Sequence, residues 1–222
     1  MREVPIASLV LDFSLYPRPD VDSQHVGYLA EAIRAGNELP PVVIDAASKR
    51  VIDGFHRVNA FKRVNGPDCK IKVMEKTYAT EAEMFIDAMR YNAAHGRTLT
   101  RYDRVHCIVK AKEFKLDDEQ IADALHLTVE TLGQLRVERV GRLRVAGLPE
   151  VPLKRTISHM AGKSLTKGQQ EANTKLSGMD QAFYANQLIT LIENDLLDTA
   201  NEQLMEKLQK LNELLDGVLA KV

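Results

Sequence analysis

The residues best suited to chemistry lie in one short segment, Arg50–Ala60. Its pattern predicts a buried strand that ends at Asp53, a tight turn at Gly54 and a helix that begins at once. The first N–H groups of a helix lack intrahelical partners and carry the positive end of the dipole, so they attract anions. His56 and Arg57 add side-chain donors there. The segment therefore predicts a phosphate-binding turn; the alternative is an ordinary turn in which Arg57 pairs with a carboxylate.

Short strands and helices must position this turn. Strands are expected at 41–44, 50–53 and 70–74, with edge-strand material at 4–6 and 9–11. Helices are expected at 23–34, from 55 to about 65, and from about 80 onward. The fold class that we predict is α+β, with a small mixed sheet in residues 1–97.

The same residues resemble the ParB and sulfiredoxin fold family. ParB N-terminal domains carry a G-x-x-R-x-x-A motif, which Gly54, Arg57 and Ala60 match position by position. The turn also resembles the Gly-x-His-Arg turn of sulfiredoxin and of free-serine kinases, and Tyr16-Pro-Arg18 and Leu39–Ile44 resemble the family's opening. The resemblance covers roughly residues 1–145 and implies a nucleoside triphosphate, usually CTP, as the cofactor. The nucleotide-binding residues that it implies are Arg18, Asp53, Gly54, His56, Arg57, Ala60, Asn92 and His95.

The chain departs from the family at Tyr91-Asn-Ala-Ala-His95, where ParB has E-N-x-x-R. In the family the Glu and the Asn help to hold magnesium near the phosphates, which leaves Asn92 as the candidate for a magnesium contact. Tyr91 is a poor replacement because magnesium prefers hard oxygen ligands, and the charge of His95 depends on pH. The resemblance therefore allows weak CTP hydrolysis at most. A small-molecule kinase of the free-serine type and an adaptor with a decayed nucleotide site are the alternatives.

Residues 117–132 follow the pattern of a helix-turn-helix. Asp117 and Thr128 are expected to cap two helices, at 118–125 and 129–143, and His126 tolerates the left-handed conformation of the turn. A bare helical hairpin would show the same pattern. DNA binding is favoured because the following segment is basic and because ParB-like proteins place this motif after the nucleotide domain. We expect base contacts from Thr128, Glu130, Thr131 and Gln134, and phosphate contacts from Arg136, Arg139 and Arg142.

The remaining chain is expected to be helical, with no strand after Leu99. We predict a helix-turn-helix domain at 98–147, a linker or loose helical segment at 148–179, where Ser, Thr, Lys and Gln dominate, and C-terminal helices at 180–222. In the last helix, apolar residues recur at alternating spacings of four and three: Leu204, Leu208, Leu211 and Leu215. This stripe forms either a dimer seam, as in ParB relatives, or an intramolecular contact with Leu188, Leu191, Ile192 and Leu196.

Composition and charge restrict the classes of protein to which this chain can belong. The 222 residues are 45% hydrophobic with a net charge of -1, which suits a globular protein and leaves room for a local basic face. The two cysteines lack zinc-ligand spacing, and no apolar stretch approaches the ~20 residues of a membrane span. The sequence thus predicts a cytoplasmic, homodimeric protein that binds double-stranded DNA in partition or transcription control, with a partition ATPase as a further partner.

Overall fold

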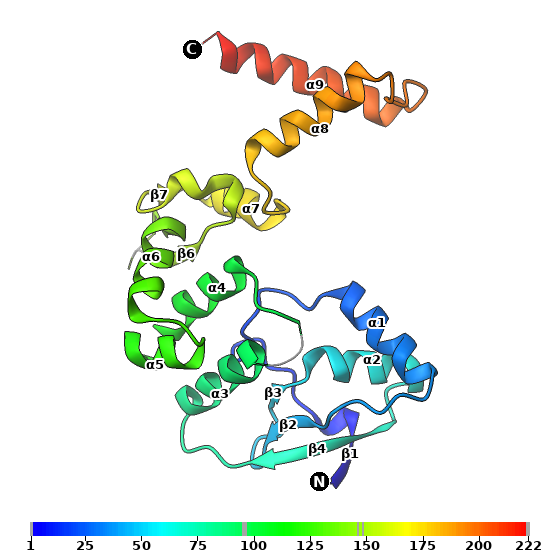
Figure 1. The fold of residues 1–222 in the computed structure, drawn as a ribbon, viewed down its shortest axis with the longest axis vertical. Helices are drawn as coiled ribbons and strands as arrows, with labels where there is room; N and C mark the ends of the chain where they lie inside the picture. The colour runs from blue at the N-terminus through cyan, green and yellow to red at the C-terminus, as the bar shows by residue number, and fades with distance from the viewer. Residues whose placement is uncertain (1, 95–96, 146, 148, 221–222) are drawn as a thin grey trace. The chain divides into compact units, whose positions relative to one another are not determined.

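The computed structural model describes residues 2–94, 97–145, 147 and 149–220, which form two units, Met1–Gly178 and Met179–Val222. The first unit contains a four-stranded sheet in the order β1-β4-β2-β3 (Figure 1). Its strands are β1 (Arg2–Pro5), β2 (Val42–Asp45), β3 (Val51–Asp53) and β4 (Lys70–Lys76). The two edge strands are antiparallel to their neighbours, and the central pair β2 and β4 is parallel. The predicted mixed sheet is confirmed, although 9–11 contributes only a bridge from Val10 to Arg50.

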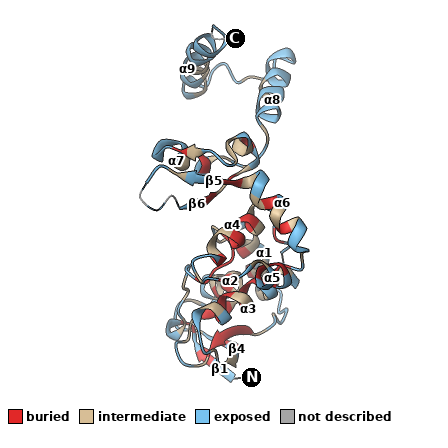
Figure 2. Cartoon of the chain, turned by 90° about the vertical axis from the view of Figure 1, so that its left-hand side faces the viewer, coloured by how far each residue is buried: buried red, intermediate tan, exposed pale blue. Residues whose placement is uncertain are grey.

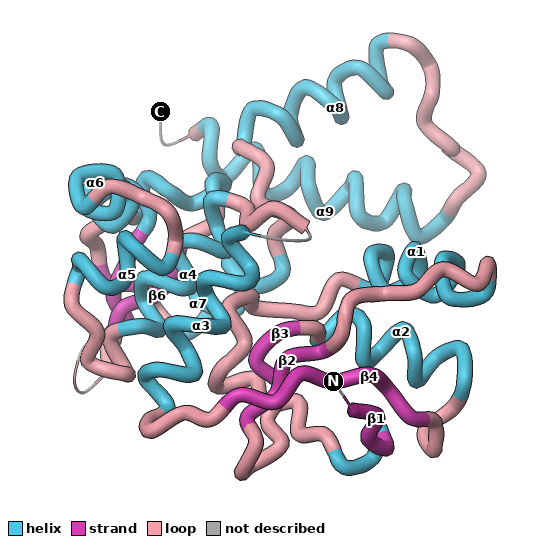
Figure 3. The backbone as a smooth tube through the Cα atoms, turned by 60° about the horizontal axis from the view of Figure 1, so that its bottom comes forward, coloured by secondary structure: helices cyan, strands magenta, loops and turns pink. Residues whose placement is uncertain are grey.

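Each face of this sheet is covered by helices. On one face α2 (Phe55–Asn65) buries Phe55 and Val58 against Val42 and Ile44. On the other, α3 (Glu81–Ala94) packs against Val43. Successive side chains of β2 thus enter different cores, as the two-residue period of a strand requires. Helix α1 (Ser23–Arg34) lies beside α2 (Figure 3).

The next three helices continue the core that α3 begins. These are α4 (Arg101–Ala111), α5 (Asp118–Ala124) and α6 (Val129–Arg139). One buried cluster runs from Val43 and Phe85 through Ile108 to Leu132. The predicted boundary at 97/98 therefore does not separate two independent cores, and Figure 2 shows buried residues continuing across it.

A second sheet occupies a region where no strand was predicted. Strands β6 (Glu150–Pro152), β5 (Val140–Leu143) and β7 (Ser164–Leu165) lie side by side in that order. The second helix of the predicted motif, expected to reach residue 143, therefore ends at Arg139. The close packing depends on Gly141, because a Cβ there would lie 2.5 Å from Cδ1 of Leu165.

The expected linker at 148–179 is corrected in the same way. A 3₁₀ segment, η2 (Arg155–Met160), and α7 (Lys167–Lys175) accompany the strands. Asn173 of α7 is 1% exposed. Its side chain accepts a hydrogen bond from the Lys154 N–H at 3.0 Å and donates one to the Pro152 carbonyl at 2.9 Å. This polar anchor fixes α7 to β6, a contact that polar composition could not reveal.

The second unit consists of α8 (Gln181–Glu193) and α9 (Glu202–Leu219). Neither helix has a buried residue among those described. In α9 the leucine stripe is half-buried at Leu204, Leu208 and Leu211 and exposed at Leu215. Helices in the described part of the chain are all too short or too polar to cross a membrane.

Candidate functional site

The turn between β3 and α2 has the conformation that the sequence predicts. Gly54 precedes α2 with φ 112° and ψ 22°, and no side chain in the described structure caps the helix there. A Cβ at this position would lie 3.0 Å from Cγ2 of Val42 and 3.1 Å from Nε of Arg57. Glycine is therefore the residue that fits without strain. The uncapped first turn of α2 leaves its N–H groups available to an anion.

This helix end lines a cavity of about 600 Å³. The cavity wall contains most of the predicted nucleotide-binding residues, namely Arg18, Asp53, Gly54, His56, Arg57 and Asn92. Ala60 does not line it; it is fully buried where α1 packs on α2, next to Val26 and Ala30. His95 lies outside the described residues. The motif alanine thus serves helix packing, while the other described members surround one space.

The guanidinium of Arg57 is held by its own domain. Nη1 donates to the carbonyl oxygens of Pro40 and Pro41, both at 2.8 Å, and Nη2 pairs with Oδ2 of Asp53 at 2.5 Å. The ion pair that the sequence offered as an alternative role for Arg57 is thus present. Since the same side chain lines the cavity, it both shapes the wall and presents positive charge there.

Arg18 lies in the same wall but is almost fully buried, with 2% of its side chain exposed. Nη1 forms an ion pair with Oδ2 of Asp103 in α4 at 2.9 Å. Nη2 donates to the carbonyl of Arg97, and Nε donates to Oδ1 of Asn92 at 3.4 Å. The donors of Arg18 are therefore engaged inside the protein, where they connect the cavity wall to α4.

His56 is an acceptor in this structure. Its Nε2 accepts a hydrogen bond from the backbone N–H of Asp22 at 3.2 Å, which places the proton on Nδ1. Burial, reinforced by the neighbouring His25 and Arg18, lowers the pKa of His56 to about 4. The ring of His25 lies 4.9 Å away, centroid to centroid. At neutral pH the imidazole is therefore uncharged, and it can offer one N–H to an anion but no positive charge.

Arg97 is a wall residue that the sequence did not single out. Its Nη1 pairs with Oδ2 of Asp22 at 3.0 Å, and 38% of its side chain is exposed. It stands two residues after His95, the position that matches the family arginine. The sequence signal for Arg97 is its position only two residues from the place of the family arginine, from which a cationic side chain can reach the same cavity.

Around Asn92 the described residues offer few of the hard oxygen ligands that magnesium prefers. The Asn92 amide is engaged, because Oδ1 faces the Arg18 guanidinium and Nδ2 donates to the Ala88 carbonyl at 2.9 Å. The Tyr91 ring lines the cavity with Lys76 Nζ 5.0 Å from its centroid, which adds positive charge. No group of three His, Cys, Asp or Glu suited to a metal occurs in the described ranges. Hard anionic oxygen, which magnesium prefers, is therefore scarce here.

Helices α5 and α6 form the predicted helical pair. Asp117 and Gln120 make a reciprocal capping box on α5, and His126 in the turn has φ 53°, as predicted. The Thr128 hydroxyl caps α6 by accepting from the N–H of Thr131 at 3.1 Å. Of the predicted base-reading residues, Thr128, Glu130 and Gln134 are exposed, and Thr131 is half-buried. The cap consumes part of the hydrogen-bonding capacity of Thr128.

The arginines expected to hold phosphates have different surroundings. Arg136 makes a two-pronged ion pair with Asp118, with both N–O distances 2.9 Å, which fixes α6 to the start of α5. Arg139 ends α6, and Arg142 is exposed on β5. Arg136 therefore stabilises the helical pair, because both of its terminal nitrogens are occupied.

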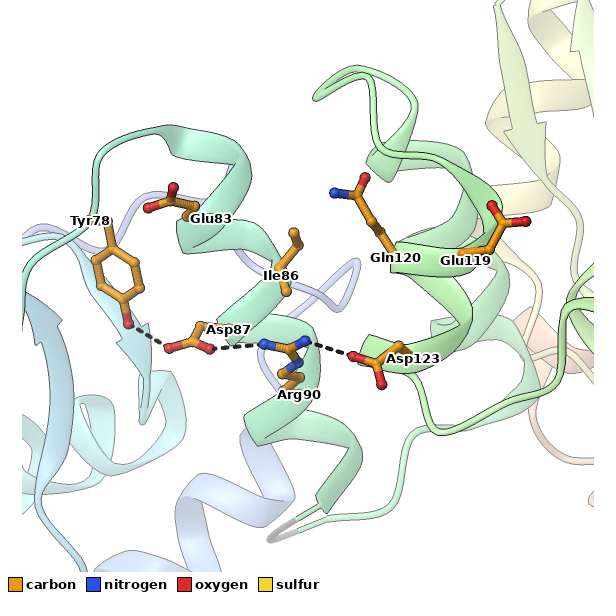
Figure 4. A pocket seen from close by; sticks show the side chains of 8 residues that line it. All are labelled: Tyr78, Glu83, Ile86, Asp87, Arg90, Glu119, Gln120 and Asp123. Carbon is orange, nitrogen blue, oxygen red and sulfur yellow. Dashed lines mark hydrogen bonds and ion pairs between the residues drawn. The ribbon is translucent and has the colours of Figure 1, made fainter.

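A second cleft separates α3 from α5 (Figure 4). Arg90 of α3 points across it to Asp123 of α5 at 2.6 Å and lies 3.9 Å from Asp87. The Tyr78 hydroxyl donates to Asp87 at 3.0 Å. Carboxylates dominate the lining, which disfavours an anionic ligand. The ion pair between Arg90 and Asp123 crosses this cleft and connects α3, whose end reaches the basic cavity, to the helical pair.

The architecture defines a class: a small mixed α/β domain with a basic cavity at a helix N-terminus, followed by a capped helical pair on a shared core. Comparison with known proteins agrees with this description. Residues 1–92 match the family model of the ParB N-terminal domain. The predicted resemblance to ParB N-terminal domains is thus confirmed over these residues.

Two bacterial relatives extend the match beyond this domain. One, from Streptomyces griseus, is described as a possible regulatory protein of the streptomycin biosynthesis operon and is 33% identical over 150 residues. The other, the transcriptional regulator NovG of Streptomyces niveus, is 28% identical over 137 residues. The matches cover 66% and 61% of this chain but only 39% and 41% of the relatives' lengths.

Solved structures show a looser similarity. A C-terminally truncated ParB of Caulobacter crescentus, in complex with its centromeric parS site, is 16% identical with a TM-score of 0.45; the match covers 62% of this chain and 71% of that one. The same protein in complex with CTP-γ-S has a TM-score of 0.38 at 17% identity, over 61% of this chain and 77% of that one.

Proposed function

We propose that this protein is a DNA-binding transcription regulator whose ParB N-terminal domain binds a nucleoside triphosphate, CTP in particular. The observation that carries the proposal is the basic cavity at the N-terminus of α2, within a family-matched domain that shares its core with a capped helical pair. The two named Streptomyces relatives favour transcription control over partition, and they also favour regulation over small-molecule phosphorylation.

The contacts support a response of DNA binding to nucleotide. The end of α3 supplies Tyr91 and Asn92 to the cavity, and one residue earlier Arg90 pairs with Asp123 of α5. From the other side, Arg18 joins the cavity wall to Asp103 of α4. A ligand that moves the end of α3 or Arg18 would change the ion pairs that hold α5 and α4 in place. Such a ligand would bind the two arrangements of the helices with different affinities, as a regulatory ligand must.

Nucleotide binding can be tested by calorimetry with CTP and ATP. We expect CTP to bind more tightly, and Arg57→Ala to weaken binding by about 1.5–3 kcal/mol, one to two decades, because a charge-assisted hydrogen bond is removed. Arg97→Gln should weaken it similarly, because Arg97 adds positive charge to the wall. Arg57 also holds the Pro40 and Pro41 carbonyls, so the thermal midpoint of each variant must be measured alongside.

Arg34→Gln is the control, since this arginine is exposed on α1 and pairs only with Glu31 among the described residues. It should leave the nucleotide affinity unchanged. If Arg57→Ala and Arg97→Gln both fold and both bind CTP with unaltered affinity, CTP does not bind in this cavity. Preference for ATP would retain the site but change the ligand.

DNA binding can be tested by selection from random duplexes, with and without CTP. We expect a defined sequence to be enriched, and Gln134→Ala to relax the preference at one position, because an amide side chain can pair with adenine in the major groove. Thr166→Ala, in the N-cap of α7, is a control outside the helical pair. Failure of the full-length protein to retain any duplex at low salt would refute the DNA-binding role.

A further inference from the structure

A basic cleft of about 500 Å³ lies between helices α4 and α6. Two arginines of α4, Arg101 and Arg104, line it together with Thr131 and Gln134, two of the expected base-reading residues of α6. Arg139 stands at the end of α6. Arg101, Arg104 and Arg139 are called the arginine cluster here. The cluster thus places positive charge from two helices beside the surface expected to meet bases.

Arg101 and Arg139 are close enough for their charges to interact. Burial lowers the pKa of Arg139, and the positive charge of Arg101 lowers it further, while Glu138 opposes the shift and Arg155 adds to it. Arg101 is ion-paired with Glu138, and about half of each side chain is exposed. Like charges gathered in this way repel, and an anion between them would relieve the repulsion.

Arg104 has hydrogen-bonding capacity left over. Its buried Nε has no hydrogen-bond partner within the described structure. Asp103, the preceding residue in the sequence, accepts hydrogen bonds from Arg18 and from the N–H of Thr100 at its Oδ2. The N-terminus of α4 is itself closed by the capping box of Thr100 and Asp103, so an anion here would be held by side chains, not by the helix end.

We propose that the arginine cluster binds the phosphate backbone of duplex DNA beside the bases that α6 reads. This inference rests on the proposed DNA-binding function and assigns the backbone contacts within it. The phosphate contact expected from Arg136 is assigned to Arg101 and Arg104 of α4, because Arg136 is engaged with Asp118. Positioning by backbone contacts and reading by base contacts would then share one cleft.

The test measures the affinity of the full-length protein for a labelled random duplex of about 30 base pairs, between about 50 and 200 mM salt. Replacing both Arg101 and Arg104 with Gln should lower the affinity on the order of tenfold or more at the lowest salt. The slope of log affinity against log salt should fall by about one for each phosphate that the variant no longer neutralises. Arg34→Gln with Arg63→Gln removes the same charge from exposed residues of α1 and α2 and should change neither quantity.

If the double variant does not fold, the single change Arg101→Gln replaces it, because Arg101 is exposed. This variant should lower the slope of log affinity against log salt by about one. Wild-type binding with an unchanged slope in this variant would overturn the inference and leave the proposed function standing. Wild-type failure to bind any duplex would instead overturn the proposed function, and the inference with it. An equal loss of affinity for a single-stranded RNA of the same length would overturn the assignment to duplex DNA.

Discussion

Replacing Arg18 with methionine is expected to lower the free energy of unfolding by about 3–5 kcal/mol, because it leaves the buried carboxylate of Asp103 without its partner. The pair is nearly solvent-free, with 2% and 9% of the two side chains exposed. Arg18 also donates to Asn92 and to the Arg97 carbonyl, which would lose a donor at the same time. Urea denaturation of the full-length protein measures the change.

Arg34→Met is the matched control. It removes an arginine from an exposed ion pair with Glu31, with side chains 49% and 72% exposed, so stability should change little. If Arg18→Met were as mild as this control, the buried pair would not be what joins the cavity wall to α4. The nucleotide affinity of Arg18→Met should also fall, because the Asn92 and Arg97 segments lose a common anchor.

Charged substitutions in the leucine stripe of α9 are expected to convert a dimer into a monomer and to weaken DNA binding by about 10²–10⁴-fold. Leu208→Asp with Leu215→Asp places two charges on the face that a partner would cover. Each fully buried leucine contributes about 1.5–3 kcal/mol, from which association costs must be subtracted. A dimer suits a helix-turn-helix, since two half-sites are then bound with the advantage of effective concentration. Light scattering at tens of micromolar gives the mass, and fluorescence titration with the selected duplex gives the affinity.

The control variants change residues of the same helix away from the stripe, with Gln203→Asp and Gln209→Asp together. They add the same charge and should leave both the mass and the DNA affinity unchanged. A monomeric wild type at these concentrations would contradict the dimer. The low burial of α8 and α9 within their own unit agrees with a surface that is completed by a partner, which is our proposal.

The candidate site was predicted where it depends on neighbours in sequence. Gly54 and the uncapped start of α2 follow from a strand, a glycine and a helix in succession, and the positive φ confirms that prediction. The partners of the arginines were not predictable, because they come from distant segments. Arg18 and Asp103 are 85 residues apart, and Arg136 and Asp118 are 18 apart. The sequence around an arginine does not indicate which distant carboxylate will form an ion pair with it.

The second sheet was missed for a related reason. Its strands have two to four residues, and β5 contains Gly141, which weakens the usual strand signal. These strands are stabilised by one another and by the packing of Leu153 and Leu165 around that glycine. Neither leucine lies in an alternating pattern long enough to predict a strand.

By itself, the sequence determined the local elements of this protein: the helices α1, α2, α3 and α5, the caps at Asp117 and Thr128, the four strands of the first sheet, and the tight turn at Gly54. These depend on propensity, periodicity and capping, which act over a few residues. Only the tertiary structure decided that residues 1–178 form one compact unit, that Arg18, Arg57 and Arg136 are engaged internally, and that Arg97 enters the cavity wall. Those outcomes depend on which distant charges and apolar faces meet when the chain packs, because buried ion pairs and shared cores form only between surfaces that folding brings together.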